Sequence, residues 1–426
     1  MTFLWGAAVA AHQVEGNNVA SDWWDYEQRG LLPYKSGRAC DFWNRWREDF
    51  DLVSSLGLSA FRFSVEWARL EPEPGRWDEE ALNRYREMTR DLRRRGVEPV
   101  VTLHHFTLPL WFARAGGFER RENLALFERY VQKVVPALAP DVQWWVTINE
   151  PVVYAYESYS RGLWPPLKKD FGLTLRVLGN LLEAHARAYS VIHRHRPDAM
   201  VSIAKHMRVM QPWRRRHPGD RLAAYLQDYL GNEAVLRSFV TGRFLGRRIK
   251  GLAGSWDYIG LNYYSRNVLR FALDPGNGFA VEVPPGPGAE TATLGWEVYP
   301  EGLYLCLRRL GRYGKPIVIT ENGISTDDAT DPTDEKRIRF LHRHLEAMAR
   351  AAGEGVDVRG YLYWSLMDNF EWAEGFDKRF GLVAVDYADL SRRPRPSAYE
   401  FSGLKERFGG AVPSSTGDGE RRAADE

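Results

Sequence analysis

The segment "VTINEP", Val146 to Pro151, combines the end of an apolar run with an amide, a carboxylic acid and a proline. It lies at the end of an apolar run, Gln143–Ile148, that predicts a buried strand. The run stops at Asn149-Glu150, and a proline follows. A strand end that turns into solvent would explain the two polar residues, and so would a strand that delivers a carboxylic acid into a site. The other predicted strands help to decide between these two interpretations.

Short runs rich in Val, Ile, Leu and aromatic residues recur along the whole chain and alternate with segments of helical periodicity. The predicted strands are Leu4–Ala10, Ala60–Val65, Glu98–His104, Gln143–Ile148, Met200–Ala204, Tyr258–Tyr263, Pro316–Thr320 and Gly360–Ser365. Eight strands in such alternation predict an α/β fold, a single-domain (β/α)8 TIM barrel. A doubly wound open sheet is the alternative, but its usual glycine-rich first turn is replaced here by "HQVEGNN".

Helix ends and loops support this organisation. Asp78 is a predicted N-cap of the helix that follows it, and Gly96 is the predicted residue after its last turn. The Pro- and Gly-rich segment Asp274–Glu290 predicts a long loop. We expect the barrel domain to occupy residues 1–408, and the small, polar residues 409–426 to form a disordered C-terminal tail.

Composition excludes several classes of partner. The chain of 426 residues has 58 Lys plus Arg and 56 Asp plus Glu, so no overall basic field favours nucleic acid or an anionic membrane. No apolar run approaches the roughly 20 residues of a membrane span. Cys40 and Cys306 form neither a disulfide framework nor a metal spacing. With no basic region before the first strand, these features predict a cytoplasmic protein, and the oligomeric state is not predicted.

Polar and aromatic side chains follow nearly every predicted strand. In a barrel the carboxyl ends of the strands form one face, where active sites are built. The residues expected at that face are Gln13, Glu15, Arg62, Glu66, Trp67, His104, His105, Asn149, Glu150, Asn262, Tyr263, Tyr264, Glu321, Asn322, Trp364, Asp368, Asn369, Glu371 and Trp372. Chance exposure of a single strand end is common, but it does not explain this convergence.

The carboxylates at the ends of the fourth and seventh strands, Glu150 and Glu321, could work as a pair. Cleavage of a glycosidic bond needs one acid that protonates the leaving oxygen and one carboxylate that attacks the anomeric carbon or activates water. Metal catalysis would need clustered His, Cys and Asp ligands, and phosphate binding would need a glycine-rich loop. Neither pattern is present, so we expect no cofactor and no metal.

The segments around these carboxylates carry a family resemblance. "TINEP" (147–151) and "ITENG" (319–323) resemble the two signature segments of glycoside hydrolase family 1, the retaining β-glucosidases and β-galactosidases. Further blocks of that family follow in the same order: "FLWGAAVAAHQVEG", "FRFSVEWARL", "LHHFTLPLW", "IGLNYYS" and "YWSLMDNFEWAEGFDKRFGL". The resemblance extends from Phe3 to about Phe408. It implies a double displacement through a covalent glycosyl-enzyme.

The resemblance also implies roles for individual residues. Glu150 would be the acid/base and Glu321 the nucleophile, with Arg62 and Tyr264 in contact with the nucleophile. Sugar-binding roles are implied for Gln13, His105, Asn149, Asn262, Trp364, Glu371, Trp372 and Phe380. Asn149 would reach the 2-hydroxyl and Trp364 would stack beneath the sugar ring. By contrast, we interpret Glu66 and His104 as structural, and His12 as a support for Gln13, while Trp23 and Trp24 stay unassigned.

Physical chemistry makes the division between the two glutamates sensible. Arg62 and Tyr264 would lower the pKa of Glu321 and keep it ionised, while the charge of Glu321 would raise the pKa of Glu150. Once the glycosyl ester forms, that charge is gone, so Glu150 loses its proton more readily and can act as a base for water. The retaining route needs the two carboxyl groups about 5–5.5 Å apart.

The departures from the family lie on the leaving-group side. "HFTLP" (105–109), "VASDWWDYEQRG" and "SRGLWPPL" all differ from the common family versions. The branch that acts on 6-phosphorylated sugars lacks the glutamate of "FEW", whereas Glu371 is present here and its charge would repel a phosphate. We therefore expect a β-glucosidase with β-galactosidase and β-fucosidase side activities, acting on a small β-glycoside or oligosaccharide. The alternatives are a transglycosylase on the same site and a non-catalytic sugar-binding barrel.

Overall fold

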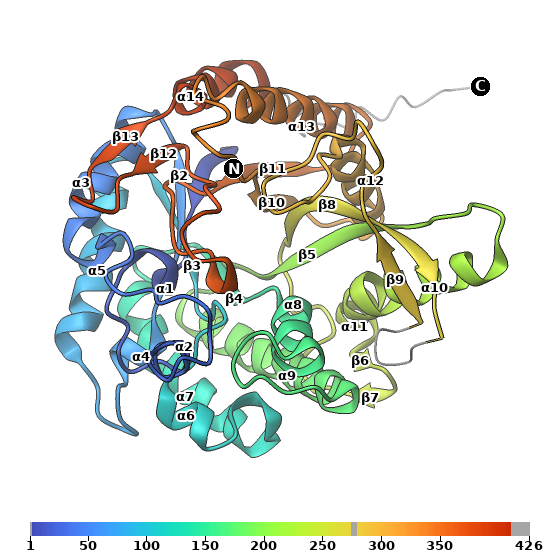
Figure 1. Ribbon diagram of the computed structural model, residues 1–426. Coiled ribbons are helices and arrows are strands. Elements are labelled where there is room, and N and C mark those ends of the chain that lie inside the picture. The colour runs from blue at the N-terminus through green and yellow to red at the C-terminus, as the bar shows by residue number, and fades with distance from the viewer. Residues whose placement is uncertain (1, 274–278, 410–426) are drawn as a thin grey trace, which may run out of the picture.

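A closed barrel of parallel strands forms the centre of the computed structural model, which describes residues 2–273 and 279–409 (Figure 1). The barrel strands are β1 (Leu4–Ala8), β2 (Ala60–Ser64), β3 (Glu98–Thr102), β4 (Trp144–Asn149), β5 (Met200–Pro212), β8 (Ile259–Phe271), β10 (Ile317–Asn322) and β11 (Val358–Trp364). The hydrogen-bonded order is β10-β11-β1-β2-β3-β4-β5-β8, and β8 pairs with β10 to close the ring. The predicted (β/α)8 barrel is therefore confirmed.

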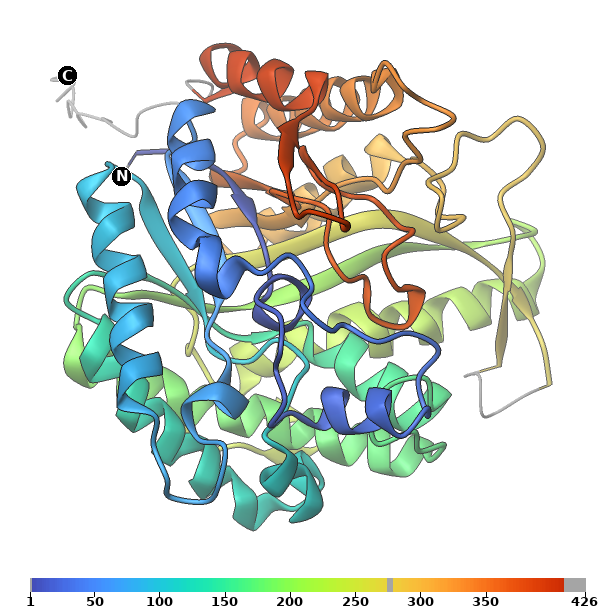
Figure 2. The same ribbon diagram turned by 60° about the vertical axis from the view of Figure 1, so that its left-hand side comes forward.

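Helices surround the strands on the outside of the barrel (Figures 1 and 2). The longer ones are α3 (Phe42–Ser55), α5 (Glu79–Arg94), α7 (Leu124–Leu138), α9 (Phe171–His195), α10 (Pro218–Asp228), α11 (Ala234–Thr241), α12 (Pro300–Gly311), α13 (Glu335–Gly353) and α14 (Pro396–Phe408). Shorter helices are α1 (Ala11–Val14), α2 (Asp22–Gln28), α4 (Trp67–Leu70), α6 (Leu110–Arg114) and α8 (Pro151–Tyr156). The small elements are η1 (Gly117–Glu119), η2 (Arg121–Asn123), η3 (Glu157–Arg161), η4 (Tyr229–Glu233), η6 (Trp372–Glu374), β6 (Arg243–Phe244), β7 (Arg247–Arg248), β9 (Ala280–Val283), β12 (Val383–Val385) and β13 (Arg392–Pro394).

The capping signals that mark the ends of α5 are confirmed. The Asp78 side chain accepts a 2.8 Å hydrogen bond from the backbone N–H of Ala81. At the other end Gly96 has φ 72°, a left-handed conformation that glycine adopts without a side-chain clash. Local sequence chemistry thus determines where this helix begins and ends.

Two apolar layers hold the barrel together. Side chains such as Val100, Trp144, Val146 and Val318 fill the interior of the strand ring. A larger core lies between the strands and the surrounding helices. Because both faces of the strands are buried, the runs are continuously apolar, and this is why they were recognisable in the sequence.

The loop predicted over Asp274–Glu290 is partly wrong. Residues Ala280–Val283 form β9, which pairs antiparallel with the distal end of β8. Backbone pairing with Val268–Phe271 and burial of Ala280 against Leu269 outweigh the loop-like composition. Both β5 and β8 also run well past their predicted ends, and together with β9 and α10 they project from one side of the barrel (Figure 1).

Other boundaries differ by a few residues. The predicted Leu4–Ala10 and Glu98–His104 strands end earlier, at Ala8 and Thr102, because the chain leaves the sheet there to form the rim. The predicted tail 409–426 lies almost wholly outside the described residues. Within 2–273 and 279–409, no helix has both the length and the apolar character needed to cross a bilayer.

Candidate active site

The predicted site residues meet at the carboxyl ends of the barrel strands. All of them are buried except Glu371, which is partly exposed. Hydrogen bonds and ring contacts connect most of them into one group: Arg62, His105, Asn149, Glu150, Asn262, Tyr264, Glu321, Trp364, Trp372 and Phe380. Gln13 and Glu371 bond to each other, and the charge of Glu321 acts on Glu371. The structure therefore brings together side chains that are more than 350 residues apart in sequence, such as Gln13 and Glu371.

Glu321 has a charged donor and a phenol donor. Arg62 Nη1 donates to Oε1 at 2.6 Å, and Tyr264 Oη donates to Oε2 at 2.7 Å. Arg62 is itself held by Thr102 Oγ1 at 3.0 Å. Both carboxylate oxygens of Glu321 are thus held in place, so the orientation of their lone pairs is fixed.

Glu150 occupies a strained turn between β4 and α8. Its φ of 43° is in the left-handed region, which costs a non-glycine residue roughly 1–2 kcal/mol. Pro151 begins α8 and sets its first turn. Asn262 Nδ2 donates to Glu150 Oε1 at 2.8 Å. The sharp turn directs the carboxyl group into the site, so the polar end of "VTINEP" does not point to solvent.

The two carboxyl groups have different electrostatic surroundings. Burial, followed by the charge of Glu321, raises the pKa of Glu150 to about 8. Burial also raises the pKa of Glu321, while Arg62 and Tyr264 oppose that rise. The sequence predicted a lowering by these two donors, and they do lower it, but desolvation is the larger effect. Since only Glu321 has a cation in hydrogen-bond contact, it is the carboxyl that ionises first.

Asn149 and His105 form an oriented pair. Asn149 Oδ1 accepts from Arg62 Nη2 at 2.7 Å and from Asn262 Nδ2 at 3.2 Å, which fixes the orientation of its amide. Asn149 Nδ2 then donates to His105 Nε2 at 3.2 Å. Burial, with the nearby Arg62 charge, keeps the pKa of His105 well below its ordinary value, so the ring is neutral. Its proton is consequently on Nδ1, a buried atom without a partner among the described residues.

Gln13 is oriented by the segment after β11. Its Nε2 donates to Asn369 Oδ1 and to Phe370 O, both at 2.9 Å, and more weakly to Glu371 Oε2 at 3.3 Å. Gln13 Oε1 is buried and, within the described part of the chain, has no donor. The Asn369 amide is fixed in turn, because its Nδ2 donates to Ser365 Oγ at 2.8 Å. Asn369 therefore makes Gln13 present an acceptor, a positioning role that the sequence did not predict.

Replacing Asn369 with alanine is expected to lower kcat/KM for an aryl β-glucoside by about 10- to 100-fold, because Gln13 loses the acceptor that orients its amide. The loss should be smaller for a substrate in which the sugar hydroxyl facing Gln13 is replaced by hydrogen, since that contact is then absent in both enzymes. Steady-state kinetics with 3-deoxy and 4-deoxy glucosides measures this difference. Equal losses on all these substrates would contradict the positioning role.

Aromatic rings pack around His105 in the same site. Trp364 and Trp372 lie nearly parallel to the His105 ring, with centroids 5.8 and 6.1 Å away. Trp372 in turn packs on His12 and Trp23. The previously unassigned Trp23 is thus a fully buried support for Trp372, and His12 supports the same ring.

Glu66 and His104 contribute to the structure, as predicted. Glu66 accepts from the backbone N–H of Ala68, at the start of α4, and from Thr107 Oγ1 at 2.8 Å. Burial lowers the pKa of His104 to about 3. His104 packs edge-on against Tyr154. In the described structure, neither side chain is hydrogen-bonded to Glu150 or Glu321.

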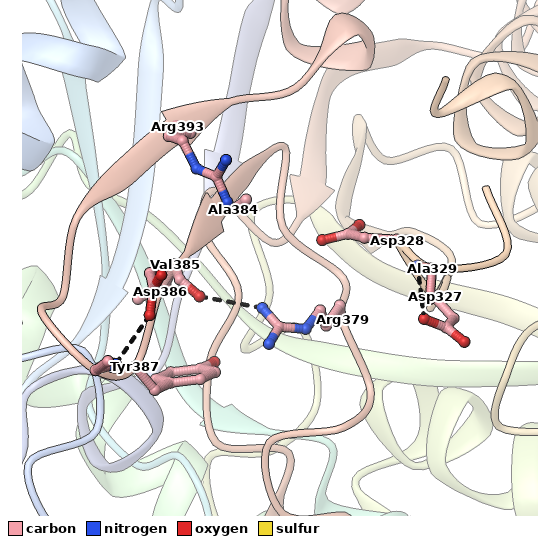
Figure 3. Close-up of a pocket in the computed structure, with 10 residues that line it drawn as sticks. Asp327, Asp328, Ala329, Arg379, Ala384, Val385, Asp386, Tyr387 and Arg393 are labelled. Carbon is pink, nitrogen blue, oxygen red and sulfur yellow. Dashed lines mark hydrogen bonds between the residues drawn. The ribbon is translucent and has the colours of Figure 1, made fainter. Parts of the chain in front are cut away.

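A separate cavity of about 490 Å³ lies outside this site (Figure 3). It is lined by Asp327, Asp328, Ala329, Arg379, Ala384, Val385, Asp386, Tyr387, Ala388 and Arg393, none of which is a predicted site residue. Over residues 2–273 and 279–409, no group of three or more His, Cys, Asp or Glu side chains is placed to hold a metal ion.

Comparison with known proteins identifies the family. The sequence matches glycosyl hydrolase family 1 over residues 1–409. The chain belongs to this family. The predicted family, fold and enzyme class, a retaining β-glycosidase that hydrolyses O-glycosides, are thereby confirmed, and neither the transglycosylase nor the non-catalytic barrel is favoured.

Family 1 relatives resemble the chain over nearly its full length. It is 33% identical to beta-glucosidase A of Thermotoga maritima, over 96% of this chain and 97% of the relative. It is 34% identical to a bifunctional beta-D-glucosidase/beta-D-fucosidase of Bifidobacterium breve, over 93% and 95%. Among solved structures, the beta-glycosidase from Pyrococcus horikoshii shares 42% identity with a TM-score of 0.89, and the alignment covers 97% of each chain.

Proposed function

We propose that this protein is a β-glucosidase with β-galactosidase and β-fucosidase side activities, which releases terminal non-reducing β-D-glycosyl residues from small glycosides. The observation that carries the proposal is the pair Glu150 and Glu321, in which one carboxyl has its pKa raised to about 8 and the other is bound by Arg62 and Tyr264. The names of the relatives, beta-glucosidase and bifunctional glucosidase/fucosidase, support the choice of sugar.

In the first step Glu321 attacks the anomeric carbon while Glu150 gives its proton to the leaving oxygen. The aglycone departs as an alcohol, and an ester joins the sugar to Glu321. Formation of this ester removes a negative charge beside Glu150. The pKa of Glu150 then falls, so Glu150 takes a proton from water, which displaces Glu321 and gives a sugar of retained configuration.

The proposed contacts with the glycone use polar side-chain atoms of the site that have no hydrogen-bond partner among the described residues. Gln13 Oε1 is an acceptor for a sugar hydroxyl, and His105 Nδ1–H is a donor. Asn149, held by Arg62, is the proposed ligand of the 2-hydroxyl. Trp364 is the proposed stacking platform, and Phe380 and Asn262 are proposed to line the same region. Solved complexes of the Thermotoga maritima beta-glucosidase with glucoimidazole and with deoxynojirimycin support a small-molecule sugar substrate.

The site disfavours 6-phosphorylated sugars for a different physical reason from the one that the sequence suggests. Burial, followed by the charge of Glu321, raises the pKa of Glu371 to about 8, so in the empty site its carboxyl is largely neutral at pH 7. Direct repulsion of a phosphate is therefore weaker than the sequence predicted. What still disfavours phosphate is Glu371 itself, since a phosphate dianion beside this carboxyl group would raise the cost of ionising it.

Hydrolysis of p-nitrophenyl β-glucoside is expected to exceed that of its 6-phosphate by at least about 100-fold in kcat/KM. A rate panel with β-galactoside, β-fucoside and cello-oligosaccharides then ranks the glycones. Proton NMR of the first-formed sugar should show the β-anomer. A first-formed α-anomer, or a preference for the 6-phosphate, would contradict the proposal.

The pH dependence of kcat/KM follows from the two pKa shifts. Glu150 must be protonated, and its raised pKa keeps it so at neutral pH, so we expect activity to fall as pH rises above about 8. Glu321 must be ionised, so activity falls again as pH drops through its own pKa, which burial raises. Because Glu371 titrates in the same alkaline range, Glu150→Gln and Glu371→Gln are compared. The alkaline limb should disappear only in the Glu150 variant.

Two further predictions stay proposals. A cytoplasmic location is supported by Cys40 and Cys306, which are both buried as free thiols. A single barrel domain over 1–408 is supported by α14, which packs on α13 and ends at Phe408.

A further inference from the structure

An irregularity in the barrel wall lies beside the proposed acid. β5 and β8 pair in regular register as far as Met207 and Tyr263, and the register shifts before Val209 and Arg266. Arg208 consequently lies opposite two residues of β8. Bulges of this kind redirect side chains and are frequent next to active sites. The carboxyl groups of Glu282, Glu157 and Glu150 all oppose the fall in the pKa of Arg208, so all three lie near its guanidinium.

Within residues 2–273 and 279–409, Arg208 has no anionic partner. Its Nη1 donates to Asn267 Oδ1 at 2.9 Å, and its Nε is buried without a partner among the described residues. Over that same part of the chain, no carboxylate oxygen comes within ion-pair distance of the guanidinium. Burial lowers the pKa of Arg208, although three carboxyl groups nearby oppose the shift. The side chain therefore combines a desolvated charge with unused hydrogen-bond donors.

Nearby arginines differ in this respect. Arg266, on the same ribbon, donates to both oxygens of Glu297 at 2.8 Å. Arg161 donates to Glu157 at 3.1 Å, so the charge of Glu157 is already engaged. Arg208 therefore does not belong to a surface ion-pair network. The parallel N–H groups of its guanidinium match the two oxygens of a carboxylate on a bound ligand.

A tryptophan connects Arg208 to the reacting groups. The Arg208 guanidinium lies 5.1 Å from the ring centroid of Trp296. Trp296 lies 5.5 Å from the ring of Tyr264, whose hydroxyl donates to Glu321. An aromatic aglycone that extended over the indole of Trp296 would therefore have the Arg208 cation beside it.

We propose that Arg208 and Trp296 form a leaving-group subsite for aglycones that carry a carboxylate on a flat, aromatic body. The inference rests on the proposed β-glucosidase function, because the leaving group is defined by the position of Glu150. Trp296 supplies the stacking surface, and Arg208 donates to the carboxylate. Glu282, exposed on β9, competes for the same cation and weakens the preference.

The test uses two substrates of nearly equal shape, 4-carboxyphenyl β-glucoside and 4-carbamoylphenyl β-glucoside, which differ in charge. The ratio of their kcat/KM values is measured for the wild type, Arg208→Gln and Arg208→Lys, with Arg266→Gln as the matched control. Intrinsic leaving-group differences cancel when the ratios are compared. We expect Arg208→Gln to lower the ratio about 10-fold, Arg208→Lys to lower it less and Arg266→Gln to leave it within about 2-fold.

An unchanged ratio in Arg208→Gln, or an equal fall in Arg266→Gln, overturns the subsite. If Arg208→Gln does not fold, as judged by its Tm, Glu282→Gln decides alone: the ratio should rise about 2- to 3-fold, and an unchanged ratio overturns the inference. p-Nitrophenyl β-glucoside separates the two proposals. No turnover of this neutral substrate by the wild type contradicts the β-glucosidase function, whereas turnover without a carboxylate preference contradicts only the subsite.

Discussion

Replacement of Glu321 by alanine is expected to lower kcat/KM for p-nitrophenyl β-glucoside on the order of 10⁵-fold, because loss of a nucleophile removes the covalent route altogether. Added azide should restore turnover by occupying the space that the carboxylate leaves. Its product should be the α-glucosyl azide, since azide attacks from the face that Glu321 used and only one inversion occurs. Product NMR and a rate measured against azide concentration check both points.

The control for Glu321→Ala must separate chemistry from folding. Removing the carboxylate leaves Arg62 buried without its 2.6 Å partner, which is itself destabilising. Glu321→Gln keeps the shape and an acceptor oxygen, so it should fold with a Tm closer to that of the wild type and still be inactive. Turnover like that of the wild type in either variant, or a β-azide product, would contradict the nucleophile assignment.

Replacement of Glu150 by alanine is expected to give a loss that depends on the leaving group. For an alkyl β-glucoside, which needs protonation to depart, kcat/KM should fall about 10³- to 10⁴-fold. For 2,4-dinitrophenyl β-glucoside the first step needs no acid, so kcat/KM should change by less than about 10-fold. With that substrate the glycosyl-enzyme should accumulate and give a burst of the phenol, because no base activates water.

Azide distinguishes the two glutamates by stereochemistry. In Glu150→Ala it attacks the glycosyl-enzyme after the first inversion, so the product should be the β-glucosyl azide. The wild-type alkaline limb of the pH profile should also be absent. Equal losses on alkyl and dinitrophenyl substrates would show that Glu150 acts by positioning and not as an acid.

Local sequence pattern predicted most of the barrel because the strands are buried on both faces. Gln143–Ile148 and Pro316–Thr320 are continuous apolar runs, and they coincide closely with β4 and β10. Helix α5 was defined by its cap at Asp78 and by Gly96. Such features depend on residues a few positions apart, and a sequence shows them directly.

Features created by pairing between distant segments were not predictable in this way. β9 forms within a Pro- and Gly-rich segment because β8 offers a free edge. The bulge opposite Arg208 depends on the register between β5 and β8, and nothing in the residues around Arg208 indicates it. For the same reason the orientation of Gln13 by Asn369 was missed, although both residues belong to recognised segments.

The sequence by itself determined the fold class, the family and the two carboxyl groups at the ends of the fourth and seventh strands. These follow from the order of apolar runs and from the residues at their ends. Only the tertiary structure decided that burial is the larger cause of the raised pKa of Glu150, that the pKa of Glu371 is raised as well, and that Arg208 is available. Each of these depends on how much water surrounds a side chain and on which charges from other strands lie beside it, and burial and proximity are properties of the packed barrel.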